Sequence, residues 1–460
     1  MDQKLGNDMS VGSIPRHLLA FSIPMLIANM LNVGYSIIDS VWLGNFAGKE
    51  AVGAIAVSFP ITFILISIAS GVTAATTILM SQYYGAKDYK MMEKVVHNSF
   101  SISLLMGILL TVGGIISSDY ILRFMQTPEE IFGAASDYLI ISFAGFIFMY
   151  IGLLISSILR GIGDTKLPLV FMGIGVAVNA VLDPFLIIGI GPFPRLGLNG
   201  AAYASVAGQV IAMIIALIYL NKKNSMLTFK PSKLVLDKHL TFLIIKLGLP
   251  STIQQSLISI GSAVITSFVN SFGASATIAF GAASRIDTIA SMLASSLGMA
   301  ASVLTGQNLG AQKSERVNEV FKWGIIITSG ITLTLSAIVI CFSQQILSVF
   351  VNDADVIDIG VTYLRITGAG YIFFAVMFIS NGIINGSGNT IVTMIFSLLS
   401  LWVIRVPLTA VLTKTSLGIS GVWLSVVISY AIVMTVSLMY YYSGKWKKTV
   451  IKSIAAKPQS

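Results

Sequence analysis

Long apolar stretches recur along the whole of this 460-residue chain, and they restrict its fold more than any other feature. We count twelve, each with about 20 or more residues, the length a helix needs to cross roughly 30 Å of hydrocarbon. In the first half they include residues 16–44, 95–116, 131–159, 167–190 and 200–220. Because backbone polar groups in lipid must be satisfied internally, such a chain folds as a helical bundle. The sequence, 55% hydrophobic and 10% charged, therefore predicts an all-α integral membrane protein with twelve transmembrane helices.

The distribution of basic residues predicts the orientation of this bundle. Most lysines and arginines fall in alternate loops, in the middle of the chain and in the C-terminal tail, whereas Lys49, Arg123, Arg195 and Lys414 fall on the other side. By the positive-inside bias, both termini are cytoplasmic and the protein is a multi-pass protein of the inner or plasma membrane. The net charge of +9 is then explained by topology and by attraction to anionic lipids, and no nucleic-acid partner is expected.

The second half of the sequence repeats the first. When residues 136–165 are shifted by 225 positions, 11 of 30 residues are identical, and Pro24 pairs with Pro250. We therefore expect two six-helix lobes, residues 1–220 and 240–444, with a cytoplasmic linker at 221–239 and a basic tail at 445–460. Because six is even, both lobes share one orientation and are related by a pseudo-two-fold axis along the membrane normal. Duplicated lobes of this kind are typical of transporters.

Asp39 is an acidic residue inside the first apolar stretch. A carboxylate near the middle of a span costs about 2.5–3.5 kcal/mol to insert, so such residues usually face a cavity or a partner. Tyr35 and Asn32 precede it by four and seven residues and share its helical face. Pro24 lies fifteen residues before Asp39 and removes one backbone donor, which predicts a weak point, or hinge, in this helix.

A second acidic residue, Asp183, is expected at a similar depth in the same lobe. Asn179 precedes it by four residues on the same face, and Tyr138 should reach the same level from a neighbouring helix. Two carboxyl groups in one poorly solvated pocket titrate as a coupled pair, which suits a binding site for H⁺. The alternative is that each acid makes separate structural hydrogen bonds to neighbouring helices.

The second lobe lacks this pair, because Ile265 stands at the position that matches Asp39. Its polar residues inside spans are fewer and form a second candidate polar site. They are Asp287, Arg285, Arg405 and Gln255. The simpler interpretation of Asp287 is a local ion pair or polar network that includes Arg285. We expect no catalytic residue, no metal site and no cofactor, apart from an ion, H⁺ or Na⁺, bound by the acidic pair.

The sequence resembles the multidrug and toxic compound extrusion family. The resemblance covers essentially the whole chain and rests on a set of motifs in their order. They are Ile38-Asp-Ser-Val-Trp-Leu-Gly44, Gln82-x-x-Gly85-Ala86, Leu159-Arg-Gly-Ile-Gly-Asp-Thr165, Asn179-Ala-Val-Leu-Asp-Pro184 and Arg405-Val-Pro407.

The resemblance implies a secondary antiporter that exports organic cations and drugs in exchange for H⁺ or Na⁺. In one branch of the family, the positions of Tyr35, Asp39, Tyr138, Asn179 and Asp183 form the cation site. Other branches carry acids on the seventh and tenth helices, where this chain has Gln254, Gln255 and no acid after Asp358.

Two other functions are compatible with a polytopic helical protein. A flippase for a lipid-linked precursor belongs to the same superfamily, but its cleft should carry several cations, and few arginines are available. An intramembrane enzyme is disfavoured because the spans show no metal-binding cluster and no protease pattern. The expected partners are small, cationic, amphiphilic substrates and membrane lipids, and the protein is expected to be a monomer. The substrate, the choice of H⁺ over Na⁺ and the stoichiometry are left open.

Overall fold

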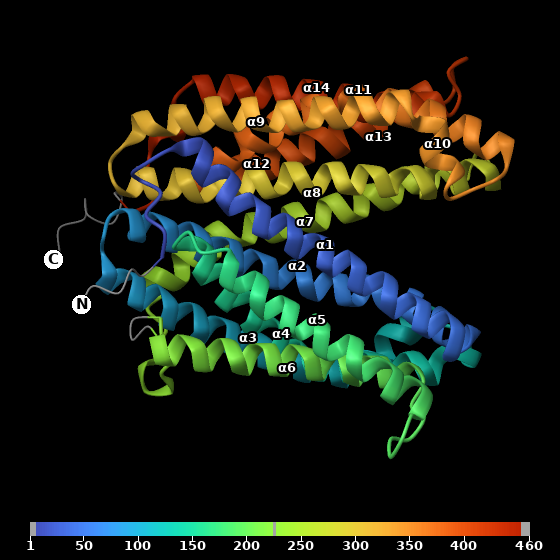
Figure 1. Ribbon diagram of the computed structural model, residues 1–460, viewed down its shortest axis with the longest axis horizontal. Helices are drawn as coiled ribbons and strands as arrows, with labels where there is room; N and C mark the ends of the chain where they lie inside the picture. Colours follow the sequence, from blue (N-terminus) through green and yellow to red (C-terminus); the bar gives the residue numbers. More distant parts are fainter. Residues whose placement is uncertain (1–5, 224–226, 452–460) are drawn as a thin grey trace. The chain divides into compact units, whose positions relative to one another are not determined.

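The computed structural model describes residues 6–223 and 227–451, and this part of the chain is helical throughout, without strands. Within it, twelve helical segments are long and apolar enough to cross a membrane, which confirms the predicted fold class (Figure 1). Residues 224–226 of the predicted linker and 452–460 of the predicted basic tail lie outside the described residues.

The first six spans are single helices, apart from a short π-helical turn, Phe185–Gly189, that extends the fifth. They are α1 (Ile14–Phe46), α2 (Lys49–Gly85), α3 (Tyr89–Phe124), α4 (Glu129–Gly161), α5 (Lys166–Pro184) and α6 (Leu198–Lys223). Helix α4 packs against α3 and α6, and α6 packs against α5. The side chains that line the candidate site below come from this group.

The second six spans are α7 to α9, α11, a composite span and α14. Their bounds are α7 (Lys238–Asn270), α8 (Ala274–Gly310), α9 (Ser314–Cys341), α11 (Ala354–Gly386), α12 (Thr390–Leu398) with α13 (Val406–Leu412), and α14 (Ser420–Tyr442). The short helix α10 (Ser343–Ser348) precedes α11. Helix α11 packs against α9 and α14, as α4 does against α3 and α6. The repeat in the sequence therefore reproduces the same helix pairings.

Matching turns also follow the repeat. After α4, Gly163 adopts φ 82° and Asp164 donates its backbone N–H to Leu159 at 2.9 Å. After α11, Gly388 adopts φ 91° and Asn389 donates to Ile384 at 3.1 Å. A residue with a Cβ rarely adopts such a φ, so glycine at both positions allows the reversal that the sequence predicts.

The chain forms two compact units, and helices α1 and α7 are each divided between them at a proline. The first unit holds Pro24–Tyr84 and Asp88–Leu249, and the second holds Asp8–Ile23, Gly85–Lys87 and residues from Pro250 onward. Helices α1 and α7 continue through Pro24 and Pro250 without a break. The boundaries of the units thus fall at a repeated proline in each half, whereas the sequence places the division at the linker.

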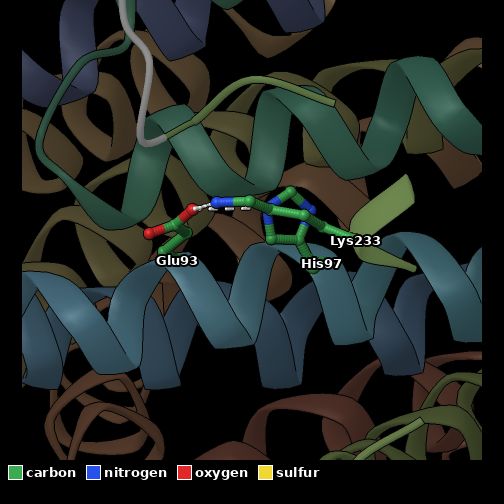
Figure 2. Close-up of polar contacts among 3 residues, drawn as sticks. All are labelled: Glu93, His97 and Lys233. Carbon is green, nitrogen blue, oxygen red and sulfur yellow. Dashed lines mark hydrogen bonds and ion pairs between the residues drawn. The ribbon is translucent and has the colours of Figure 1, made fainter. Parts of the chain in front are cut away.

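The linker is attached to the first unit by polar and aromatic contacts. Figure 2 shows Lys233 of the linker reaching Glu93 of α3, with Nζ and Oε1 2.5 Å apart, and His97 beside them. The backbone N–H of Asp237 donates to the side chain of Asn98 at 2.8 Å, and the carboxylate of Asp237 caps the start of α7. These contacts explain why the linker and the start of α7 belong to the first unit.

The fifth span departs from a regular α-helix at Pro184. Helix α5 ends at Pro184, and the π-helical turn Phe185–Gly189 completes the span. In the repeated span, the π-helical turn Leu399–Arg405 lies just before Pro407. Proline has no backbone N–H, so the α-helical hydrogen-bond ladder cannot continue through it unchanged. The irregular backbone therefore lies next to the buried Asp183 in one unit and ends at Arg405 in the other.

Candidate functional site

The two acids that the sequence singles out lie close together in the first unit. Asp39 comes from α1 and is half-buried, whereas Asp183 comes from the last turn of α5 and is fully buried. The two carboxyl groups interact electrostatically with each other, and Asp39 also interacts with Tyr35 and Tyr138. The structure therefore brings the predicted pair and both predicted phenols into one neighbourhood.

A hydrogen-bonded chain connects α1, α6 and α5 in this neighbourhood. The Tyr35 hydroxyl lies 2.7 Å from Ser205 Oγ, and Asn179 Nδ2 donates to Ser205 Oγ and to Asp183 Oδ1, each at 3.3 Å. Ser205 therefore connects two residues that the sequence predicted to act together. Nothing in the sequence singled it out, because serine is common in transmembrane helices; its only distinguishing feature is its place among the small residues of α6.

Close packing of α5 on α6 brings Asn179 and Ser205 within hydrogen-bonding distance of each other. A Cβ placed on Gly208 of α6 would lie 2.5 Å from the carbonyl oxygen of Gly175 on α5, which real side chains do not tolerate. The two glycines let the helix backbones approach one turn from Asn179 and Ser205. The short side chains of Asn179 and Ser205 can then meet without an intervening group.

Several oxygen atoms of this group have no hydrogen-bond partner within the described part of the chain. They are Asp39 Oδ1, Asp183 Oδ2 and Asn179 Oδ1. Buried polar atoms are nearly always paired in folded proteins, so an unpaired cluster of acceptors needs an explanation. Carboxylate and amide oxygens accept hydrogen bonds and can also coordinate hard cations, so a hydrogen-bond donor, a proton or such a cation can occupy this place.

A cavity of about 400 Å³ inside the first unit reaches this site. Asn32, Tyr35, Asn179 and Ser205 line one part of it, while Arg160 and Thr165 line another. The walls between are largely apolar and rich in methionine and phenylalanine. All of the lining residues belong to the first unit, so the cavity is formed by one lobe alone. The predicted residue Asn32 thus contributes to the cavity wall.

The second unit holds a different acid in a different arrangement. Both carboxylate oxygens of Asp287 on α8 accept hydrogen bonds from tyrosines of α11: Oδ2 from Tyr363 and Oδ1 from Tyr371, the latter at 2.5 Å. Arg405 interacts with Asp287 electrostatically, donates to Ser429 at 3.0 Å and lies over the Tyr430 ring. Asp287 and Arg405, which were predicted to form a second-lobe polar site, therefore do lie in one network.

Asp287 lies in a polar network, one of the two predicted alternatives, but Arg285 is not part of that network within the described residues. The Arg285 side chain is exposed, its guanidinium lies 5.8 Å from the centre of the Phe350 ring, and no ion pair with Asp287 occurs within the described residues. Residues two apart on a helix point in nearly opposite directions, so this pair could not meet. In the described part of the chain no hydrogen bond joins Gln255 to Asp287, while its neighbour Gln254 donates to Ser397 at 2.7 Å. The second-lobe site is therefore smaller than the sequence suggested.

These features define a multi-pass membrane protein made of a duplicated six-span unit, with a buried acidic site inside one of the two units. The sequence model of the MatE family, the multidrug and toxic compound extrusion proteins, matches residues 24–185 and again residues 250–411. The chain belongs to this family, and the two matches have the spacing that the internal repeat predicts. Members of the family are transporters, which excludes the intramembrane enzyme.

Similar proteins agree with this assignment over the full length of the chain. The probable multidrug resistance protein YoeA of Bacillus subtilis is 33% identical over 95% of this chain and 96% of its own length. The probable multidrug resistance protein YpnP of the same organism is 33% identical over 96% of this chain and 97% of its own length. The fold matches a solved outward-facing multidrug resistance MATE transporter with a TM-score of 0.89 at 23% identity, covering 96% of this chain and 98% of that one.

Proposed function

We propose that this protein is a secondary antiporter that exports organic cations and drugs in exchange for H⁺, or for Na⁺, by alternating access between its two lobes. The observation that carries the proposal is the pair of interacting acids in the first unit, which leave oxygens without partners within the described residues, beside a cavity. Similar family members are named as multidrug resistance proteins, which favours drug export over a flippase.

The proposed coupling site consists of six residues of the first unit: Asp39, Asp183, Asn179, Tyr35, Tyr138 and Asn32. In the proposed mechanism these residues bind the coupling ion from the extracellular side and release it to the cytoplasm. Inward movement of a proton is worth about 2.3 kcal/mol per 100 mV plus about 1.36 kcal/mol per pH unit. This energy drives export only if the ion and the substrate weaken each other's binding. A binding site for the ion that adjoins a cavity for the substrate provides such a linkage.

Helix α1 is the proposed link between protonation and the cavity. It carries Asp39 and Tyr35 on one side of Pro24, and Asn32 and Met25 from the same helix line the cavity. Neutralising Asp39 changes the preference of its side chain for polar neighbours. Because Pro24 removes a backbone donor, a small movement of α1 at this residue is the expected response. Such a movement would change the cavity wall that the substrate contacts.

The transport experiment that tests this function uses everted membrane vesicles. We expect ethidium, or a fluoroquinolone, to accumulate inside when a proton gradient is imposed with sodium absent. Accumulation with a sodium gradient alone would assign the coupling ion to Na⁺. If neither gradient drives accumulation in vesicles that contain the folded protein, the antiport proposal is wrong.

The orientation of the chain belongs to the same proposal, with both termini cytoplasmic and contacts to anionic lipids on that side. The functional unit is proposed to be the monomer, since the acidic site and the cavity lie within a single chain. A cysteine placed at Lys230 in the linker should react with an impermeant thiol reagent only from the cytoplasm, and one at Glu129 only from outside. The opposite labelling at either position would overturn the orientation.

A further inference from the structure

Arg160 is a half-buried cation to which the proposed mechanism assigns no task. It lies in the last turn of α4, its Nε is buried without a hydrogen-bond partner, and no carboxylate pairs with it among residues 6–223 and 227–451. The nearby Asp164 is occupied elsewhere, since its Oδ1 accepts from the backbone N–H groups of Lys166 and Leu167. A guanidinium inside a membrane protein is costly unless a partner or a function retains it.

Arg160 also lines the same cavity that reaches the acidic site. Along α5 the cavity runs from Asn179 to Pro168, eleven residues or roughly 16 Å at 1.5 Å per residue. Along α6 it runs from Ser205 to Ala216, the same distance. The cavity is therefore elongated, with the acids near one end and an unpaired guanidinium at the other.

The walls between these two ends suit an apolar molecule of variable shape. Five of the lining side chains illustrate this character: Phe148, Met149, Phe171, Met172 and Met213. Methionine is flexible and polarisable and adapts to irregular partners. Small-molecule sites commonly combine such walls with a few fixed polar groups that orient the ligand. The fixed group at the far end is cationic, and guanidinium groups bind carboxylate and phosphate in a bidentate manner.

We propose that Arg160 binds the anionic group, carboxylate or phosphate, of an amphiphile whose apolar body lies along this cavity. Such a ligand is an amphiphilic anion, or a zwitterion that also places a cationic group towards Asp39 and Asp183. This inference rests on the proposed function in that the ligand is a transported one. The binding itself needs no gradient and is measured without transport.

The test measures binding of dansylamino-undecanoate to the purified protein in phosphatidylcholine nanodiscs, with empty nanodiscs subtracted. Its primary amide is the uncharged comparison. We expect the wild-type protein to bind the carboxylate more tightly than the amide, and Arg160→Gln to weaken carboxylate binding about tenfold or more, as loss of a charged hydrogen bond does. Amide binding should be unchanged in this variant, and Arg160→Lys should retain part of the carboxylate affinity.

Lys166→Gln is the matched control, because it removes an exposed positive charge six residues further along, at the start of α5, and Lys166 is not part of the cavity lining. Its carboxylate affinity should equal that of the wild type. Equal carboxylate binding by Arg160→Gln and wild type, or equal loss of carboxylate and amide binding, would overturn the proposal. If Arg160→Gln does not fold, the test rests on the wild-type protein. Equal affinity of the wild type for the carboxylate and the amide would then contradict the proposal.

Competition then distinguishes a soluble anion from a lipid headgroup as the source of the ligand. Dodecyl phosphate should displace the probe in phosphatidylcholine nanodiscs. If phosphatidylglycerol nanodiscs weaken probe binding in the wild type but not in Arg160→Gln, the occupant is an anionic lipid; equal binding in both lipids assigns the site to soluble amphiphiles. Failure of gradient-driven ethidium transport with intact probe binding would remove the antiport proposal and leave this site standing.

Discussion

Asp183 and Asp287 are both acids inside spans, the first buried and the second half-buried, yet their surroundings differ in one decisive respect. Asp183 has one oxygen bonded to Asn179 and the other without a partner, whereas both oxygens of Asp287 accept phenolic hydrogen bonds. A carboxylate that accepts a hydrogen bond on each oxygen has less capacity for an incoming ion than one with an unpaired oxygen. The comparison therefore favours an exchangeable site in the first lobe and a structural network in the second.

The two lobes also show how a repeated frame can carry different chemistry. Tyr138 and Tyr363 occupy the same place in the repeat, 225 residues apart, and each faces an acid. The acid comes from α1 in the first unit and from α8, the counterpart of α2, in the second. The two units thus share the tyrosine position but carry the acid on different helices. The acid that faces the tyrosine in the second unit accepts two phenolic hydrogen bonds.

The largest effect is expected from Asp39→Asn, which should reduce gradient-driven export of ethidium to background in everted vesicles. The asparagine imitates a permanently protonated acid, so the ion can no longer be exchanged. Glu50→Gln, an exposed acid of the same lobe, is the control and should export normally. Wild-type export by a folded Asp39→Asn protein would show that the pair is structural and would remove the contrast between the lobes.

Substrate binding should also lose its pH dependence in Asp39→Asn. In the wild type, raising the pH from about 5 to 8 deprotonates the acid pair and should strengthen binding of a cationic substrate, since ion and substrate compete. The variant should remain near the weak affinity of the wild type at acidic pH throughout. Equilibrium binding of ethidium to purified protein measures this, and a variant that still follows the wild-type pH curve would contradict the role of Asp39.

Asp287→Asn should have the opposite profile, with reduced stability and largely intact proton-driven export. It weakens two hydrogen bonds to a charged group, each typically worth about 1.5–3 kcal/mol, and leaves Arg405 with less compensation. The midpoint of thermal unfolding should fall, whereas Asp358→Asn, an exposed change in the same unit, should leave it in place. Complete loss of export by folded Asp287→Asn would move the ion site to the second lobe.

The smallest effect is expected from Ser205→Ala, which removes the bridge between Tyr35 and Asn179. Two hydrogen bonds are lost, and each one that contributes about 1 kcal/mol corresponds to roughly a fivefold loss in the rate of export at limiting substrate. Ser117→Ala is matched in chemistry, because Ser117 bonds only to the backbone of its own helix. If both variants export at the wild-type rate, Ser205 is not part of the site.

The sequence alone predicted the twelve spans, the duplicated lobe and the short set of acids inside spans. These features are local or linear: a span needs only length and hydropathy, a repeat needs only a constant shift, and an acid in an apolar stretch stands out wherever the helix packs. The grouping of Asn32, Tyr35 and Asp39 was predictable for the same reason, since helical periodicity alone places them on one face.

Only the tertiary structure decided which groups meet across helices. It placed Ser205 between Tyr35 and Asn179, gave Asp287 two tyrosines in place of Arg285, and left Arg160 unpaired beside a cavity. Each of these outcomes depends on how far one helix is rotated and how closely it packs on its neighbour. The glycine contact between α5 and α6 sets that distance at the acidic site, and no pattern within a single helix encodes it.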